Sequence, residues 1–286
     1  MPEENKIKDA ADAVKGVLEA VPIYQDALQP ATKEIGKGLQ TVAKLINVAL
    51  APIKGLVWSY EKLEDYLGER LSHKLQYVPP EQIITPPPLL AVPAMQSLML
   101  TAGEPNLSEL YANLIATSMD KATTIDAHPS FVEIIKQMSS DEAKIVGLFG
   151  KRRSFPCLKM QVLDGDGKGM IQNLIDHFTL LCEEAGCDNP ERTGLYIDNL
   201  QRLGLLIVLN DSPLYYESNY EPLIKHKTIK ALRKRVEDES DAVLETIKGS
   251  ISVTTLGTEF YNACVVEKGQ KRIDTIPSRI LNFTDY

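Results

Sequence analysis

The first candidate for a chemical role is a glycine-rich segment whose residue types and spacing suit metal binding. Asp164-Gly-Asp166-Gly-Lys168-Gly169 alternates carboxylates with glycines, as the start of a calcium-binding loop does. In such a loop the fifth position should offer an oxygen ligand and the twelfth a bidentate glutamate, but the sequence has Lys168 and Ile175 there. The segment therefore predicts a tight polar turn and not a calcium site.

A histidine and two cysteines nearby have side chains that zinc prefers as ligands. His177, Cys182 and Cys187 follow one another at steps of five. Five residues rotate a helix by about 500°, or about 140° beyond a full turn, so the three do not share a helical face. No CxxC pair is present. We therefore expect no metal, and we expect the four cysteines to be buried thiols of a reducing compartment.

The motifs of common enzymes are missing from the sequence. It has no GxxxxGK[ST] phosphate loop, no GxSxG and no HExxH. His128-Pro129 stands at the expected start of a helix, where the histidine is predicted to cap that helix and not to act as a base. We therefore expect a non-enzymatic protein without a cofactor or a small-molecule substrate.

A basic run near the C-terminal end is the candidate for contact with a partner. It consists of Lys225, Lys227, Lys230, Arg233, Lys234 and Arg235. Acidic residues follow at once from Glu237, so the charged helix that we expect from about Pro222 to Lys248 has one basic and one acidic part. Two interpretations stay open: a solvated or protein-binding face, or a surface that contacts nucleic-acid phosphates.

The order of the elements around this run predicts the fold of residues 151–286. We expect a helix from about Ile171 to Ala185, a second from Glu191 to Leu203, and a closing helix from Thr255 to Val266. Strands are predicted at residues 205–208, 215–216 and 251–254. This order resembles a winged-helix domain with a short β-hairpin and an inserted charged helix. Its groove helix would expose Arg192, Asp198, Asn199, Gln201 and Arg202, whose mixed charges suit phosphates poorly.

A hydrophobic stripe dominates residues 1–76. Its members follow at steps of three and four: Ile35, Leu39, Val42, Ile46, Ala49, Ile53, Leu56, Tyr60, Leu63 and Leu67. This spacing predicts elongated helices with a heptad seam, kinked or broken at Pro52. The stripe could pack within the chain, drive self-association, or act as an amphipathic segment that binds membranes; acidic neighbours such as Glu61 and Asp65 oppose the last use.

Prolines separate this segment from a second helical region. Residues 77–93 contain six prolines, which predicts a stiff, extended connector that serves as a spacer or, alternatively, as a ligand for aromatic grooves. Residues 94–150 are predicted to form a central helical region, with capping boxes that start at Asn106 and Ser139.

Composition limits the class of protein. The chain has 286 residues and a net charge of −8, which excludes coating of nucleic acid by bulk charge. The N-terminal end has no apolar run behind its lysines, and the apolar residues 39–58 include Lys44 and Lys54. We therefore expect a cytoplasmic, mainly α-helical protein of about two domains.

Four stretches together resemble one known family. They are LSELYANLIATSMD at 107–120, HPSFVEIIKQMSSDEAKIV at 128–146, YIDNLQRLGLL at 196–206 and TTLGTEFYNAC at 254–264. In this order they are similar to the Abi-alpha (abortive infection protein alpha) family. The resemblance implies a bacterial protein of phage defence, and it supplies no catalytic residue.

The stripe and the resemblance together set our functional expectation. We expect a phage-defence protein that works through protein contacts, with the stripe driving assembly. A nucleic-acid-binding regulator that uses the C-terminal domain and a membrane-disrupting effector that uses the N-terminal helices are the alternatives.

Overall fold

The computed structural model describes residues 38–54, 61–101, 103–167, 169–239, 242–267 and 272. The described chain forms two compact units. The first contains the residues up to Gly103 together with Tyr111–Glu133, and the second contains Glu104–Leu110 together with Ile134–Val266. The partition predicted from the sequence, with boundaries after residues 76, 93 and 150, stays a prediction.

Helices make up the first unit. It contains α3 (Gly38–Lys54), α4 (Glu61–Leu75), α5 (Pro88–Leu100), most of α6 (Pro105–Ser118) and two short 3-10 helices, η1 (Pro80–Gln82) and η2 (Thr124–Asp126). The core comes from all four α-helices. The buried apolar residues are Leu45, Ile46, Ala49 and Leu50 of α3, Leu67, Leu71 and Leu75 of α4, Leu90, Ala91, Ala94, Met95 and Leu98 of α5, and Tyr111, Leu114 and Ile115 of α6. Pro52 lies inside α3, and the next helix begins only at Glu61.

The proline-rich segment divides into a connector and a helix. Its first part carries η1 and docks on the unit through Ile83, which is buried and pairs with Asp120 as an isolated β-bridge. Its second part belongs to α5, which starts at Pro88 and continues past Pro93. A proline fits the first turn of a helix because the amide hydrogen that it lacks would have no partner there.

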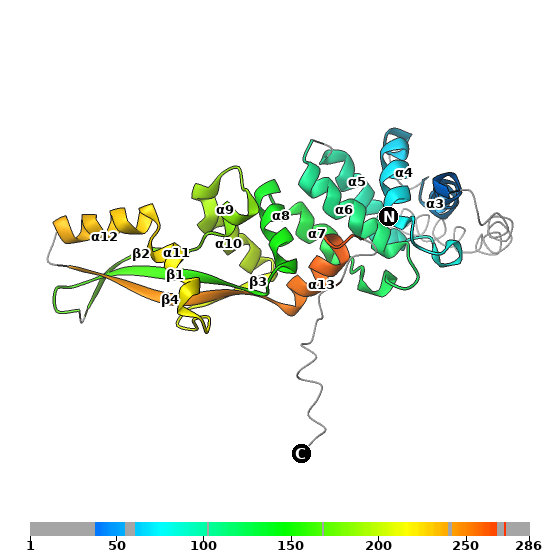
Figure 1. The fold of residues 1–286 in the computed structure, drawn as a ribbon. Coiled ribbons are helices and arrows are strands. Elements are labelled where there is room, and N and C mark those ends of the chain that lie inside the picture. Colours follow the sequence, from blue (N-terminus) through cyan, green and yellow to red (C-terminus); the bar gives the residue numbers. More distant parts are fainter. Residues whose placement is uncertain are drawn as a thin grey trace, which may run out of the picture. The chain divides into compact units, whose positions relative to one another are not determined.

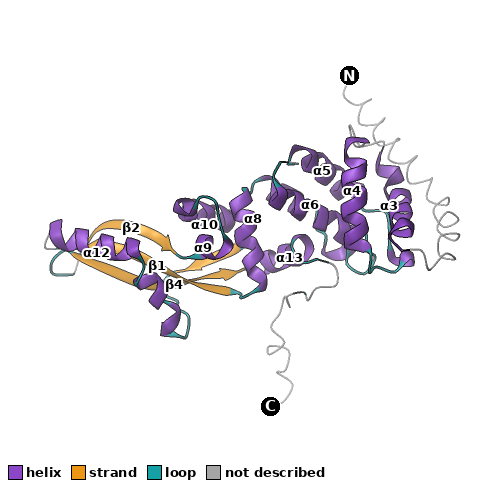
Figure 2. Cartoon of the chain, turned by 45° about the horizontal axis from the view of Figure 1, so that its top comes forward, coloured by secondary structure: helices purple, strands orange, loops and turns teal. Residues whose placement is uncertain are grey.

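The second unit is built on an antiparallel sheet. Its strands are β1 (Ser154–Leu163), β2 (Met170–Phe178), β3 (Leu206–Leu209) and β4 (Val243–Val253), in the order β2-β1-β4-β3. Its helices are α7 (Ser130–Lys136, shared with the first unit), α8 (Ser140–Val146), α9 (Leu181–Ala185), α10 (Thr193–Arg202), α11 (Glu221–Ile224), α12 (Lys227–Glu239) and α13 (Thr255–Cys264), with 3-10 helices η3 (Gly147–Gly150), η4 (Pro190–Arg192) and η5 (Glu217–Asn219). Figures 1 and 2 show the long strands β1 and β4 side by side, with α12 lying along the sheet.

The winged-helix prediction is wrong, because the sheet has four strands where we expected a short hairpin. Of these strands, β1 precedes the helices of the predicted motif, and β2 occupies the first part of the helix predicted from Ile171 to Ala185. The glycine-rich segment is the turn between them, where Gly167 has φ of +67° and the Asp164 amide donates to the Gly169 carbonyl at 2.9 Å. The tight turn predicted there is therefore confirmed.

A β-bulge explains why β2 was predicted as a helix. Leu158 pairs with Phe178 and Met160 with Ile175, so β1 advances by two residues where β2 advances by three. Residues three positions apart on a regular strand point to opposite faces. The extra residue of the bulge lets Ile175 and Phe178 both pack against the core cluster around Met160. An apolar spacing of three in a sequence normally indicates a helix.

The long charged helix is also shorter than we expected. It divides into α11 and α12, and the residues from Val243 onward form β4, which pairs with β1 along ten residues. The predicted strand at residues 251–254 is thus the end of a much longer one. Tyr215 and Tyr216, predicted as a strand, lie in a loop and are 91% and 67% exposed.

The closing helix α13 is held tightly to the start of β3. Thr254 caps it by accepting the Gly257 amide at 2.8 Å, and its hydroxyl also donates to the Gly204 carbonyl. A side chain at Gly257 would overlap the Leu205 carbonyl oxygen. This glycine therefore sets how closely the helix and the strand approach.

We predict that Gly257→Ala destabilises the protein by about 1–3 kcal/mol, because a methyl group overlaps backbone that cannot move aside. Gly68→Ala is the matched control: Gly68 lies inside α4 with nothing near its Cβ position, so alanine should stabilise by up to about 1 kcal/mol. Thermal unfolding of both variants checks this. A higher midpoint for Gly257→Ala would contradict the packing.

Candidate functional site

The start of α8 carries the densest polar cluster that we find in the second unit. Ser139 accepts the Glu142 amide at 3.3 Å, and the Glu142 carboxylate accepts the Ser139 amide at 2.5 Å. This is the capping box predicted from the sequence. Asn106 does not start the other predicted box, because α6 already begins at Pro105. The side-chain amide of Asn106 instead donates to the Ser140 hydroxyl at 2.8 Å.

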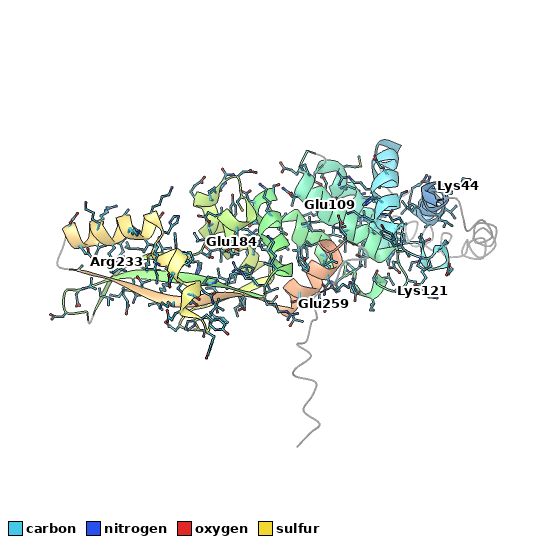
Figure 3. The ribbon with its side chains drawn as sticks, viewed as in Figure 1. Lys44, Glu109, Lys121, Glu184, Arg233 and Glu259 are labelled. Atoms are coloured by element: carbon cyan, nitrogen blue, oxygen red, sulfur yellow. The ribbon has the colours of Figure 1, made fainter. Side chains whose placement is uncertain are left out.

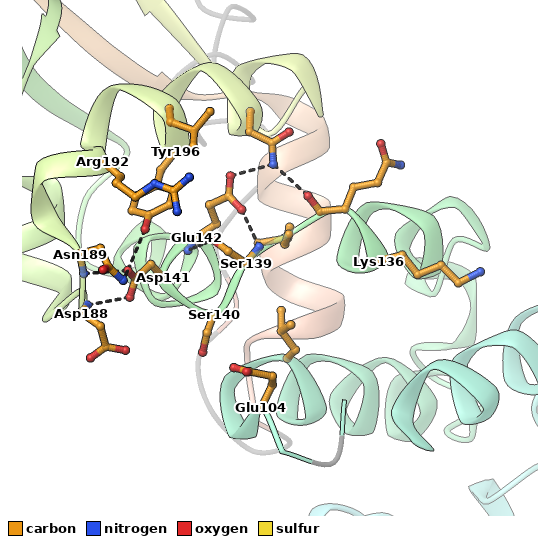
Figure 4. A pocket seen from close by; sticks show the side chains of 15 residues that line it. Glu104, Lys136, Ser139, Ser140, Asp141, Glu142, Asp188, Asn189, Arg192 and Tyr196 are labelled. Atoms are coloured by element: carbon orange, nitrogen blue, oxygen red, sulfur yellow. Dashed lines mark hydrogen bonds between the residues drawn. The ribbon is translucent and has the colours of Figure 1, made fainter. Parts of the chain in front are cut away.

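Asp141, inside this first turn, is the centre of the cluster. Its carboxylate is buried and receives five hydrogen bonds, drawn in part in Figure 4. The backbone amides of Asp188 and Asn189 donate at 2.8 and 3.0 Å, and the Tyr196 hydroxyl donates at 3.0 Å. The Asn189 side chain at 3.4 Å and the Lys144 ammonium at 3.2 Å complete the set. One carboxylate thus joins α8 to the α9–α10 connection and to α10.

These contacts decide the charge of Asp141. Burial on its own would raise the pKa of this carboxyl, but the donated hydrogen bonds from Asp188, Asn189, Tyr196 and Lys144 outweigh it and hold the pKa far below the ordinary 3.8. Burial, together with the hydrogen bond to Asp141, raises the pKa of Tyr196 to about 12. At neutral pH Asp141 is therefore a permanent anion and Tyr196 a permanent donor.

The polar face of α10 is used inside the unit. Asn199 donates to the Glu142 carboxylate at 2.7 Å and to the Gln137 carbonyl at 2.9 Å, and Arg202 donates to the Gln137 side chain at 2.9 Å. The Gln201 side chain accepts the Val208 amide of β3 at 3.1 Å. Most of the side chains assigned to a groove-facing surface therefore fix α10 to its neighbours.

An open pocket of about 740 Å³ lies beside Asp141. Its wall includes Lys136, Ser139, Asp188, Arg192 and Tyr196 (Figure 4). Six of its lining residues already form hydrogen bonds with one another: Ser139, Asp141, Glu142, Asn189, Tyr196 and Asn199. The pocket can hold solvent or a small polar molecule, but its central anion has no free lone-pair direction for proton transfer.

A second pocket, of about 920 Å³, lies between β2, α10 and the start of α12. His177 lines it and approaches Asp198 with Nε2 at 3.3 Å from the carboxylate oxygen. The other ring nitrogen, Nδ1, is buried and makes no hydrogen bond with another described residue. A molecule in this pocket would thus find no ring nitrogen of His177 that is both accessible and unpaired.

The cysteines are free thiols, and Cys157, Cys182 and Cys264 are buried. Burial raises the pKa of Cys157 to about 12 and raises the pKa of the other three thiols as well. His177 lies on β2, Cys182 on α9 and Cys187 beyond it, and no metal-binding group of His, Cys, Asp or Glu occurs among the described residues. Thiols with such pKa values are poor nucleophiles at neutral pH.

The predicted basic run is one exposed surface. Lys225 precedes α12, and Lys227, Lys230, Arg233, Lys234 and Arg235 lie on it; all six are exposed. Figure 3 labels Arg233 in this helix. The apolar residues Ile229, Leu232 and Val236 of α12 pack against the sheet residues Met160 and Leu244. We call the six cations the basic face of α12.

The structure places only part of the hydrophobic stripe. Ile46, Ala49 and Leu67 are buried inside the first unit. Ile35, Leu56 and Tyr60 lie outside the described residues, and the side chains of Leu39, Val42, Ile53 and Leu63 are not among those described. No helix in the described ranges is long and apolar enough to span a bilayer.

His128 and Asp141 show what sequence reasoning reached and what it missed. His128 caps α7 as predicted, since its Nδ1 accepts the Ser130 amide at 3.2 Å. Asp141 was not singled out, because its hydrogen-bond partners are 47, 48 and 55 residues away. Its position inside a capping box was the only available signal, and an acid there normally indicates just a favourable helix start.

Residues 59–264 match one protein family. The model of the family described as abortive infection alpha matches residues 59–264. The chain belongs to this family. The match includes Asp141, α10 and the whole basic face of α12, whereas most of the hydrophobic stripe precedes it. Membership connects this chain with abortive infection, the defence in which phage-infected bacteria stop growing or die before virus is released.

Other comparisons add little. One solved structure, of an uncharacterized protein from the hydrocarbon-degrading marine bacterium Alcanivorax borkumensis SK2, is 17% identical and covers 51% of this chain and 96% of its own, with a TM-score of 0.34. That value is too low to support an argument about the fold. A comparison with curated proteins gives no match.

We predict that Asp141→Asn lowers the free energy of unfolding by about 3 kcal/mol at pH 7, because an amide loses the charge and turns a donor toward other donors. The folded pKa of Asp141 is depressed, so its stabilisation is present above pH 3.8 and is lost as the pH falls toward the folded pKa. The difference between wild type and variant should therefore shrink in acid. Denaturant unfolding at several pH values measures it.

Asp188→Asn is the control for this prediction. The Asp188 side chain is 76% exposed, and Lys144 is its one ion-pair partner among the described residues, so loss of its charge should cost less than about 1 kcal/mol. Equal losses in the two variants would contradict the central place of Asp141.

Proposed function

We propose that this protein defends bacteria against phage by binding another macromolecule and that it does not catalyse a reaction. The saturation of Asp141 carries the proposal. A general base needs an accessible lone pair and a pKa near the working pH, and Asp141 has five donors around it and a pKa far below that range.

Two further features of the second unit support a binding role. His177 offers neither ring nitrogen to the adjoining pocket, and the thiols are held protonated. In contrast, the basic face of α12 is fully presented to solvent on a helix that is fixed to the sheet. A rigid charged surface is suited to recognition of a partner.

We predict that charge reversal on α12 removes phage protection. The variant Lys227→Glu/Lys230→Glu/Lys234→Glu has a net charge of −14 in place of −8, since each substitution replaces a positive charge by a negative one. The control Lys44→Glu/Lys121→Glu/Lys151→Glu has the same net charge and alters exposed cations elsewhere. Efficiency of plating and survival of infected cells should change in the first variant and stay at the wild-type value in the second.

Two outcomes would contradict the proposal. A wild-type protein that protects against no phage in a broad panel would argue against the defence role. Protection retained at full strength by the α12 variant would argue against binding through this surface.

We propose self-association only through those stripe residues that the structure does not place in the core. Ile46 and Leu67 are already covered within one chain, so they cannot also cover a second copy without opening the unit. Leu56→Asp tests the remaining stripe. If the stripe drives assembly, light scattering should give a smaller mass for this variant than for wild type; equal masses would reject the assembly role.

A further inference from the structure

We infer that the basic face of α12 binds the phosphate backbone of nucleic acid. The inference rests on the proposed binding function and names the chemical class of the partner. Its starting point is the set of exposed cations at residues 225–235, on a helix whose opposite side is buried.

Packing fixes the geometry of this face. Ile229, Leu232 and Val236 hold α12 against the sheet core around Met160 and Leu244. At about 100° per residue, Lys227, Lys230 and Lys234 fall on the side opposite these three and within about 60° of one another. At about 1.5 Å per residue they span roughly 10 Å along the helix. The three ammonium groups therefore form a row that can follow several phosphates of one strand.

The order of charges along α12 does not serve the stability of the helix. Helices are stabilised by acids in the first turn and bases in the last, and α12 has neither. Lys227 and Lys230 stand in its first turn, Arg233, Lys234 and Arg235 near its middle, and Glu237 and Asp238 near its C-terminal end. The two lysines of the first turn and the two acids near the C-terminal end all oppose the macrodipole, and the positive end of the dipole adds to the charge of these two lysines. This arrangement lowers helix stability and increases the positive potential at one end.

Intramolecular pairing leaves most of these cations available. Lys225 pairs with Glu221 at 2.5 Å. Lys227, Lys230, Arg233 and Lys234 form no ion pair with any other residue in the described ranges. Four mobile charges on a fixed helix can neutralise phosphates without first breaking a contact.

The composition of this face favours nucleic acid over a protein or a membrane. Between the cations it exposes Thr228 and Ala231 and no large apolar side chain. The centre of a protein–protein interface is enriched in aromatic residues and depleted of lysine. A membrane-surface helix needs apolar side chains that enter the boundary between head groups and acyl chains, but the apolar side chains of α12 pack against the sheet. Phosphate contacts, in contrast, are made mainly by lysine and arginine.

The negative charge of the whole chain does not prevent this binding. Charges more than about 8 Å away are largely screened at physiological ionic strength, so the local surface decides. The acidic surroundings should instead make binding weak and steeply dependent on salt. About four phosphate contacts predict a slope near −3.6 in log K against log salt, which is roughly a 100-fold loss between 50 and 200 mM.

The test measures fluorescence anisotropy of short labelled duplex DNA and of single-stranded RNA with the full chain at several salt concentrations. We expect binding of one or both, with a slope of about −3.6 for the duplex and about −2.8 for the single strand, because each phosphate contact contributes about 0.9 on a duplex and about 0.7 on a single strand. Lys227→Gln/Lys230→Gln/Lys234→Gln should reduce the magnitude of the slope by about 1 for each substitution. The charge-matched control Lys44→Gln/Lys121→Gln/Lys151→Gln, two of whose residues are labelled in Figure 3, should leave the slope unchanged. Thermal melting confirms that each variant is folded.

Three results would overturn the inference: no binding of either nucleic acid at low salt, equal binding by the α12 variant and wild type, or α12-dependent binding to phosphatidylserine vesicles alone. These results are separable from failure of the proposed function. If the α12 variant loses phage protection but wild type binds no nucleic acid, binding through this face stands and the partner has a different chemistry.

Discussion

The second unit depends on one buried anion. Asp141 is held ionised by two backbone amides, a tyrosine hydroxyl, an asparagine amide and a lysine. A buried carboxylate is costly unless nearly all of its lone pairs are satisfied, so any rearrangement of the α9–α10 connection that withdraws these donors is penalised. The carboxylate therefore selects one position of α10 relative to α8.

From α10 the constraint reaches the sheet. Gln201 caps a free amide of β3, and Gly257 lets α13 close against the start of the same strand. The sheet in turn carries α12 on Met160 and Leu244, which presents the basic face as a rigid surface. In this arrangement the polar network fixes the helices within the unit, and we propose that the exposed cations contact the partner.

What could be predicted from the sequence is what depends on neighbouring residues. The capping box at Ser139, the cap at His128 and the turn before Gly169 follow from local chemistry, and the exposed cations follow from their number and spacing. The strand β2 could not be predicted, because the bulge opposite Leu158 and Met160 gives it the spacing of a helix. The anchoring of Asp141 was equally hidden, since its partners become neighbours only after folding.

Lysine footprinting by mass spectrometry tests the central claim most directly. Acetylation of the full chain is measured at low salt without nucleic acid, with duplex DNA and with single-stranded RNA. If the basic face of α12 is the binding surface, Lys227, Lys230 and Lys234 become protected, while Lys121 and Lys151 react as before. Unchanged labelling of α12, or protection elsewhere in the chain, would contradict it.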